Sequence, residues 1–166
     1  MAINISKIIS QILPNDEVRH KCLSDLVDIF IYNKLGINLI WYGRGNNGRD
    51  TLRHIVSITF TEFVSNEFGE LLNNEYNKKL NFIYHESNFK QLSGNKLLLT
   101  NYIYPSIDEY DKYKCKIIEF TTEFSYENNN ICTTLQSKID DNIIDCRAQF
   151  MEILQISLIL LMILSF

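Results

Sequence analysis

Proline and glycine are scarce in this sequence, and a strongly basic balance is absent. The 166 residues contain only two prolines and six glycines, which excludes disorder over most of the chain. The net charge of −4 is unlike that of a freestanding nucleic-acid-binding domain, so any DNA contact must come from a local patch. Hydrophobic residues make up 46% of the chain, which is enough for the core of one domain.

The four cysteines lack the spacing of a metal site. None forms a Cys-x-x-Cys pair, and no histidine stands at a ligand-like spacing from any of them, so zinc is not expected. The first residues, "MAINISKIIS", have no long apolar core of the kind that secretory signals carry. We therefore expect an intracellular protein with free thiols at Cys22, Cys115, Cys132 and Cys146.

An uncharged apolar run, "ISLILLMILSF" at 156–166, is too short to cross a membrane. A spanning helix needs about 20 apolar residues, and Glu152 and Gln155 interrupt any upstream extension. We expect a buried last helix and no clear membrane anchor. A short membrane-associated tail is the alternative.

Hydrophobic periodicity predicts helices at both ends of the chain and in its middle. Apolar residues at helical spacing cover 3–13, and Pro14 interrupts this pattern. Asn15 or Asp16 is suited to cap the next helix because its side-chain oxygen can accept from the first backbone N–H groups. The predicted helices are 3–13, 17–32, about 51–72 and about 135–164.

Short apolar runs between these helices predict the strands of a sheet. Buried strands bounded by helices indicate an α/β sheet, here with N-terminal helices and a helical C-terminal tail. We divide the chain into a helical lead-in at 1–37, a core at 38–125 and a C-terminal helical segment at 126–166. The predicted strands are 37–42, 80–86, 95–101 and 115–120.

The stretch "GRGNNGRD" follows the first predicted strand and resembles a phosphate-binding loop. Such a loop points successive backbone N–H groups at an anion, and the next helix adds its positive N-terminus. Glycines permit the backbone angles, and asparagines tolerate left-handed ones. On the loop alone, an ordinary Gly/Asn turn is an equally good interpretation. The residues that would form the cradle are Gly43, Gly45, Asn46, Asn47 and Gly48.

The end of the loop departs from the Gly-Lys-Ser/Thr pattern of such sites. Arg49 stands where the lysine reaches the phosphates, and its planar fork does not replace a point charge. Asp50 stands where a Ser or Thr hydroxyl binds Mg²⁺, and Thr51 comes one position late. The Asp50 carboxylate could coordinate Mg²⁺, but without metal it would repel a nucleotide.

Two stretches together resemble the helicase domain of superfamily 3, which includes the primase-helicases of poxvirus-type viruses and phages. The first is "LPNDEVRHKCLSDLVDIFIYNKLGINLIWYGRGNNGRDTL", which is similar to the family's helix, strand and phosphate loop. The second is "KLLLTNYIYPSIDEYDKYKCKIIEFTTEF", which is similar to its motif C. The positions that carry this second likeness are Thr100, Asn101, Pro105, Asp108, Phe120 and Phe124.

The resemblance implies a reduced, P-loop NTPase-type three-layer fold in the core and a role for several residues. Asn101 would sense the γ-phosphate, and Glu86 would act near Mg²⁺ or the attacking water. The usual acidic partner of Glu86 is replaced by His85, which we interpret as a strand-surface histidine. Asp50 and Thr51, with Glu86, would face the metal, so ATP and Mg²⁺ are the implied cofactors.

Other features of the family are missing from this sequence. Almost nothing separates Gly94 from Lys96, where the family carries the hairpin that grips DNA. Cys115 and Lys116 stand at the arginine-finger position, and lysine cannot supply the forked donor. Lys112, Lys114 and Lys116 are spaced by two, which would place them on one strand face as a DNA patch or as a solvated surface.

The resemblance therefore implies a shortened, divergent ATP-binding domain of a viral DNA-replication helicase, with hydrolysis weak or lost. Its partners would be DNA and either further copies of itself or a full-length helicase. It would act in the host cytoplasm or at a viral replication site. The alternative is a non-catalytic assembly or regulatory protein that retains the fold and binds a helicase partner.

Overall fold

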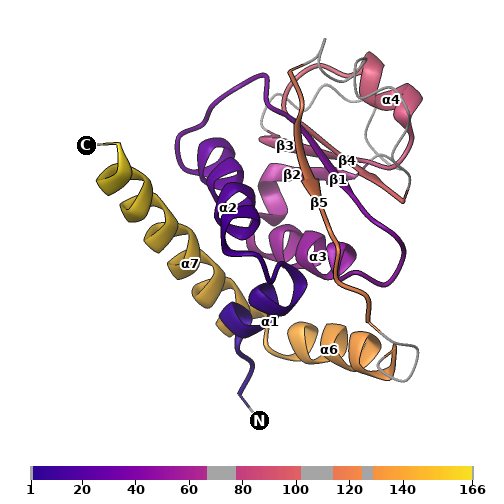
Figure 1. Ribbon diagram of the computed structural model, residues 1–166, viewed down its shortest axis with the longest axis vertical. Coiled ribbons are helices and arrows are strands. Elements are labelled where there is room, and N and C mark those ends of the chain that lie inside the picture. The colour runs from indigo at the N-terminus through magenta and orange to yellow at the C-terminus, as the bar shows by residue number, and fades with distance from the viewer. Residues whose placement is uncertain (1, 67–77, 102–113, 125–128, 166) are drawn as a thin grey trace.

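The computed structural model describes residues 2–66, 78–101, 114–124 and 129–165, and its centre is a five-stranded parallel sheet (Figure 1). The strand order is β2-β3-β4-β1-β5. The four predicted strands are all present, although β3 ends before Glu86. The strands are β1 (Asn38–Tyr42), β2 (Val64–Asn66), β3 (Leu80–Ile83), β4 (Lys96–Thr100) and β5 (Lys116–Glu119).

Two N-terminal helices form where the apolar periodicity predicts them. Asn4 caps α1 by accepting from the Lys7 N–H at 2.8 Å. Asn15, one of the two residues expected to cap α2, does so by accepting from two backbone N–H groups, each at 3.0 Å. The described helices are α1 (Ile5–Ile12), α2 (Asp16–Phe30), α3 (Arg49–Thr59), α4 (Glu86–Gln91), α6 (Asn129–Asp141) and α7 (Ile143–Leu164).

The predicted helix over 51–72 is wrong in its length. α3 ends at Thr59, and a 3₁₀ turn at Thr61–Phe63 leads into β2. β2 has only three residues, too few to show alternation, and pairs in parallel with β3. Tertiary pairing therefore decides the conformation of a segment whose β-branched residues fit either state. Residues 67–77 lie outside the described part of the chain.

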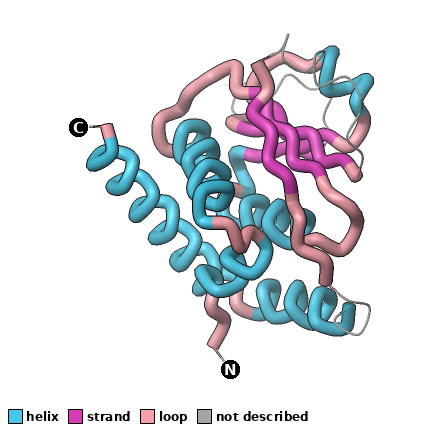
Figure 2. Tube along the Cα trace, viewed as in Figure 1, coloured by secondary structure: helices cyan, strands magenta, loops and turns pink. Residues whose placement is uncertain are grey.

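The helices cover the sheet from two sides (Figure 2). α1, α2, α3 and α7 share one apolar cluster with one face of the sheet, where Trp41 and Phe82 are fully buried. α4 packs against β3 and β4 on the other face, where Phe89 meets Ile40 and Leu98. The described residues therefore form helix, sheet and helix layers.

The larger cluster draws on all three segments into which we divided the chain. Ile5 comes from α1, Trp41 from β1 and Phe150 from α7, and each is fully buried. The Phe150 ring meets that of Phe60 edge-on, with centroids 6.5 Å apart. The C-terminal helix is thus part of the core that supports the sheet.

The expectation of one buried last helix is wrong in two respects. The predicted segment is two helices separated at Asn142, whose Nδ2 donates to the Lys138 carbonyl at 2.8 Å. One side of α7 packs on the core from Cys146 to Leu161, and the other side is exposed. Ile159 and Ile163 lie on that outer side and are 56% and 64% exposed. By length and composition alone α7 could cross a membrane.

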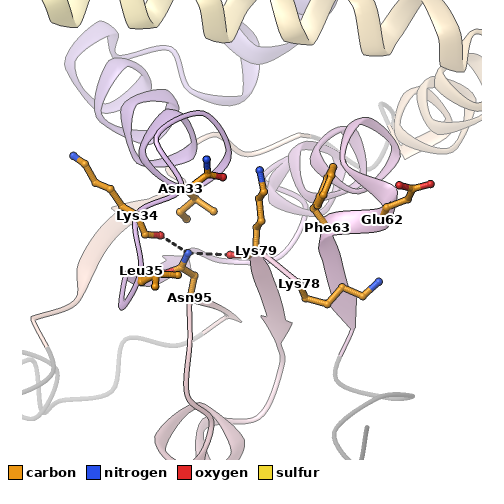
Figure 3. Close-up of a pocket in the computed structure, with 9 residues that line it drawn as sticks. Asn33, Lys34, Leu35, Glu62, Phe63, Lys78, Lys79 and Asn95 are labelled. Carbon is orange, nitrogen blue, oxygen red and sulfur yellow. Dashed lines mark hydrogen bonds between the residues drawn. The ribbon is translucent and has the colours of Figure 1, made fainter. Parts of the chain in front are cut away.

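At the edge where the strands begin, Asn95 joins three chain segments (Figure 3). Its Oδ1 accepts from the Ile37 N–H at 2.9 Å. Its Nδ2 donates to the carbonyls of Lys34 at 2.8 Å and Lys79 at 3.0 Å. This buried amide therefore fixes the segments that lead into β1 and β3 against the start of β4.

Candidate nucleotide-binding site

The glycine-rich loop lies at the carboxyl ends of the strands, between β1 and α3. β1 and β4 are neighbours in the sheet but not in the sequence. From β1 the chain continues to β2 at one edge, whereas from β4 it continues to β5 on the other side of β1. The strand order thus reverses between β1 and β4, and open parallel sheets bind ligands in the crevice outside such a point.

The backbone of this loop has the conformations that its glycines and asparagines predict. Asn46 has φ 61° and Gly48 has φ 81°, both in the left-handed region. A Cβ on Gly48 would lie 2.6 Å from the Ile12 side chain. A Cβ on Gly43 would collide with the Phe120 carbonyl and the Asn47 amide. The loop is therefore closely packed at Gly43 and Gly48, whereas Gly45 is exposed with open space around it.

The segment that follows β5 lies over the loop. The Phe120 N–H donates to the Tyr42 carbonyl at 2.8 Å, and the Phe124 N–H donates to the Asn46 carbonyl at 2.9 Å. The Phe124 ring borders the position of Gly48. Two phenylalanines of the second motif thus contact the first motif. Two other positions of that motif, Pro105 and Asp108, lie outside the described residues.

Arg49 is buried and joins the loop to the end of β4. Its guanidinium donates from Nη1 to the Thr100 carbonyl and from Nη2 to Asn101 Oδ1, the latter at 2.7 Å. Its side chain is only 7% exposed, and no described residue accepts from its Nε. Burial lowers the pKa of Arg49, and the neighbouring Asp50 and Tyr84 oppose that effect.

The Arg49 contacts bring together two residues that the sequence predicts for one site. Arg49 belongs to the predicted phosphate loop, and Asn101 is the predicted γ-phosphate sensor. Two N–H groups that could reach a phosphate are, however, donated to the protein itself. An anion would have to displace these bonds or use the Arg49 Nε and the loop backbone.

Asn47 closes the loop upon itself. This buried side chain donates from Nδ2 to the Arg44 carbonyl at 2.5 Å. Its Oδ1 accepts from the Arg49 N–H at 3.1 Å. The Arg49 N–H lies at the start of α3, where phosphate loops direct free N–H groups at the anion. Asn47 therefore occupies one donor of the expected cradle.

The residues predicted to face Mg²⁺ begin two different helices. Asp50 is exposed and Thr51 is buried, both in the first turn of α3. Glu86 is half-buried and begins α4, with the exposed His85 as its N-cap. Among the described residues, no three His, Cys, Asp or Glu side chains gather to hold a metal ion. Mg²⁺ bound through nucleotide phosphates requires only one or two protein carboxylates, which the exposed Asp50 fits.

The predicted row of lysines does not lie along one strand. β5 begins at Lys116, and Lys114 precedes it in a turn with φ 50°. The Lys116 ammonium contacts Asp25 at 2.8 Å and Asp28 at 3.5 Å, which ties β5 to α2. Lys112 lies outside the described residues.

Sequence reasoning assigned Asn47 to the cradle but missed its side-chain role, and it missed Tyr84. Tyr84 follows β3 at the same edge and acts electrostatically on Arg49. Its place in the last residues of the predicted strand 80–86 was the available signal, since parallel strands end at one edge. The inward bonds of Asn47 depend on the folded loop, so no pattern in the sequence indicated them.

Comparison of the chain with protein-family models finds no match, and comparison with curated proteins finds none either.

Proposed function

We propose that this protein is a divergent nucleotide-binding domain related to superfamily 3 helicases, with weak or absent hydrolysis. The proposal is carried by the buried bridge from Arg49 to Thr100 and Asn101. This bridge links the loop after β1 to the end of β4 at the point where the strand order reverses. These are the two positions to which the resemblance assigns phosphate binding and phosphate sensing.

Three further observations support a phosphate site at this edge. The loop has left-handed backbone at Asn46 and Gly48, and it leads into a helix of eleven residues. Gly48 has no side chain to cap α3, and Asn47 accepts only from the Arg49 N–H, so the first turn of this helix has further N–H groups to offer, at Asp50 and Thr51. The buried Nε of Arg49 is directed at no described acceptor. An anion would satisfy these donors.

Weak catalysis follows from how the same residues are engaged. The Arg49 fork and its backbone N–H are bonded within the protein, so nucleotide binding must compete with these bonds. His85 replaces the acidic partner of Glu86, and Lys116, at the arginine-finger position, is paired with Asp25. The site would therefore bind and release a nucleotide without hydrolysing it.

The inward bonds of Arg49 favour one alternative, a scaffold that retains the fold without nucleotide. In that case the Arg49 bridge would only join β1 and β4, and the protein would act through a helicase partner or further copies of itself. DNA binding at Lys114 is a further expectation of the nucleotide-binding proposal.

Restoring the usual loop residues tests the proposal directly. We would compare the melting temperature with and without Mg²⁺-ATP for the wild type, for Arg49→Lys/Asp50→Thr and for Arg44→Ala, which changes an exposed arginine of the same loop. Ligand at 100 times its Kd stabilises by about 2.7 kcal/mol, or roughly 5–10 °C for a chain of this size. We expect a small shift in the wild type and in Arg44→Ala, and a larger one in the double variant.

The outcomes separate the two functions. If Mg²⁺-ATP changes the melting temperature of none of the three proteins, the loop is a turn and the scaffold alternative holds. ATP turnover would be measured in parallel, with and without single-stranded DNA. Robust turnover by the wild type that Arg49→Ala abolishes would contradict the loss of catalysis.

A further inference from the structure

Arg49 stands at the position from which a phosphate loop reaches the outermost phosphate of its nucleotide. In such loops the backbone N–H groups hold the α- and β-phosphates, whereas the lysine after the last glycine extends to the β- and γ-phosphates. Here that residue is an arginine, whose guanidinium donates to the Thr100 carbonyl and to Asn101 Oδ1. The donors for the first two phosphates are therefore distinct from the donor for the third.

The backbone donors for the first two phosphates are available. Among the described residues, no acceptor takes the N–H groups of Gly45, Asn46 and Gly48 in the loop. The N–H groups of Asp50 and Thr51, in the first turn of α3, have no described acceptor either. Free N–H groups in a glycine-rich loop, followed by the positive end of a helix, form an anion site. Two phosphates could therefore bind here without breaking a hydrogen bond of the protein.

The donor for a third phosphate is engaged within the protein. Arg49 is buried, and its two Nη groups are both bonded at the end of β4. Hydrogen bonds from a charged donor are about twice as strong as those between neutral groups. A third phosphate that used Arg49 would have to break both bonds, which would leave the Thr100 carbonyl and Asn101 Oδ1 without their donor. The bridge therefore opposes a third phosphate but not the first two.

The charge of Asp50 acts in the same direction. Asp50 stands at the position of the hydroxyl that binds Mg²⁺ in phosphate loops, and its carboxylate acts electrostatically on the Arg49 guanidinium. The positive charge of Arg49 is therefore partly balanced before any ligand arrives. A third phosphate would bring further negative charge toward the same carboxylate, and like charges repel each other.

Given the nucleotide-binding function, on which this inference rests, we propose that the site selects a nucleoside diphosphate over a triphosphate. The two phosphates would lie on the loop backbone, and the Arg49 bridge would stay intact. Specificity is a difference of affinities, and acceptors left unpaired by one ligand count against that ligand. The affinity should therefore pass through a maximum at two phosphates, whereas a purely electrostatic attraction would rise or fall steadily with their number.

Isothermal titration calorimetry of the full chain with AMP, ADP and ATP, each with Mg²⁺, tests this proposal. Arg49→Lys replaces the planar fork by a point charge, which loosens the bridge to Thr100 and Asn101 and can reach a third phosphate. Arg53→Lys is the matched control, because it makes the same change one turn further along α3. The Arg53 guanidinium lies over the Phe82 ring, 5.9 Å from the ring centroid, and not at the end of β4.

We expect the wild type and Arg53→Lys to bind ADP at least about tenfold more tightly than either AMP or ATP. In Arg49→Lys, tighter binding of ATP should reduce the preference for ADP over ATP to about threefold or less. Circular dichroism would verify that both variants are folded.

The outcomes separate this inference from the function on which it rests. A wild type that binds ATP or AMP as tightly as ADP overturns the selection of a diphosphate, while nucleotide binding stands. A folded Arg49→Lys variant with the wild-type preference also overturns it, because the bridge would then not be the cause. A wild type that binds none of the three nucleotides overturns both proposals.

Discussion

Asn47→Ala should lower the stability of the protein. It should also free the Arg49 N–H, which Asn47 occupies and which a bound phosphate could use. The Asn47 side chain makes two hydrogen bonds, one to the Arg44 carbonyl and one from the Arg49 N–H. Alanine removes both. Asn47→Asp keeps an acceptor for the Arg49 N–H but cannot donate to the Arg44 carbonyl. The two variants therefore separate the contributions of the two bonds.

The size of the effect follows from the number of bonds and their burial. A neutral intramolecular hydrogen bond contributes about 1 kcal/mol net, so Asn47→Ala should cost about 2 kcal/mol and Asn47→Asp about 1 kcal/mol. For a chain of this size, 2 kcal/mol corresponds to a fall in melting temperature of roughly 4–8 °C. Asn46→Gly is the control, because glycine tolerates the left-handed φ of 61° at that position. Its cost should be at most about 0.5 kcal/mol.

Urea unfolding followed by circular dichroism would measure these free energies. Binding of Mg²⁺-ATP to the same variants would then show whether the freed Arg49 N–H strengthens the site. The reasoning is refuted if Asn47→Ala unfolds at the same urea concentration as Asn46→Gly. It would mean that the side chain of Asn47 does not hold the loop closed.

Three other outcomes test the surroundings of the site. Lys116→Met should cost roughly 2–4 kcal/mol at neutral pH, because it leaves the buried Asp25 unpaired while Lys116 itself is partly exposed. Burial alone would lower the pKa of Lys116, but the two aspartates outweigh it and hold that pKa above its usual 10.5. This cost should therefore be constant from neutral pH to about pH 10 and should shrink as the pH rises further, as unfolding at each pH would reveal. It should also shrink in acid, because burial raises the pKa of Asp25 and the protonated carboxyl needs no partner. Burial raises the pKa of the Cys22 and Cys146 thiols, so neither should be alkylated in the native protein at pH 8, whereas peptide mapping after unfolding should find both modified. Phe150→Ala should cost about 3–5 kcal/mol in urea unfolding, and a cost below about 1 kcal/mol would contradict the placement of α7 in the core.

The strands and caps could be predicted because they depend on local patterns. Apolar runs predicted β1, β3, β4 and β5, and the place before a periodic segment narrowed the cap of α2 to Asn15 or Asp16, of which Asn15 is the cap. β2 could not be predicted, since three residues show no period and pairing with β3 creates the strand. The composition of 51–72 favoured one helix throughout. In the structure α3 ends at Thr59, and the chain goes on to form β2.

The direction of side chains at the site could not be predicted either. The sequence indicates that Arg49 follows the loop, but its burial against Thr100 depends on β1 and β4 being neighbours. Likewise, the C-terminal run of apolar residues does not show which side of α7 packs on the core and which side, with Ile159 and Ile163, is exposed. Lys96 illustrates the same limit: it is buried, with its ammonium donating to the Phe89 carbonyl at 2.5 Å and the Leu92 carbonyl at 2.7 Å.

The Asn95 side chain has a consequence for how the sheet assembles. It bonds to Ile37 and Lys34, which lie 58 and 61 residues earlier in the chain, and to Lys79, 16 residues earlier. Closing loops of that length costs entropy before any contact repays it, so these bonds form only once the strands have met. A single amide then couples the entry of three strands. The edge at which the sheet begins should accordingly open all at once, as one cooperative unit, and not strand by strand.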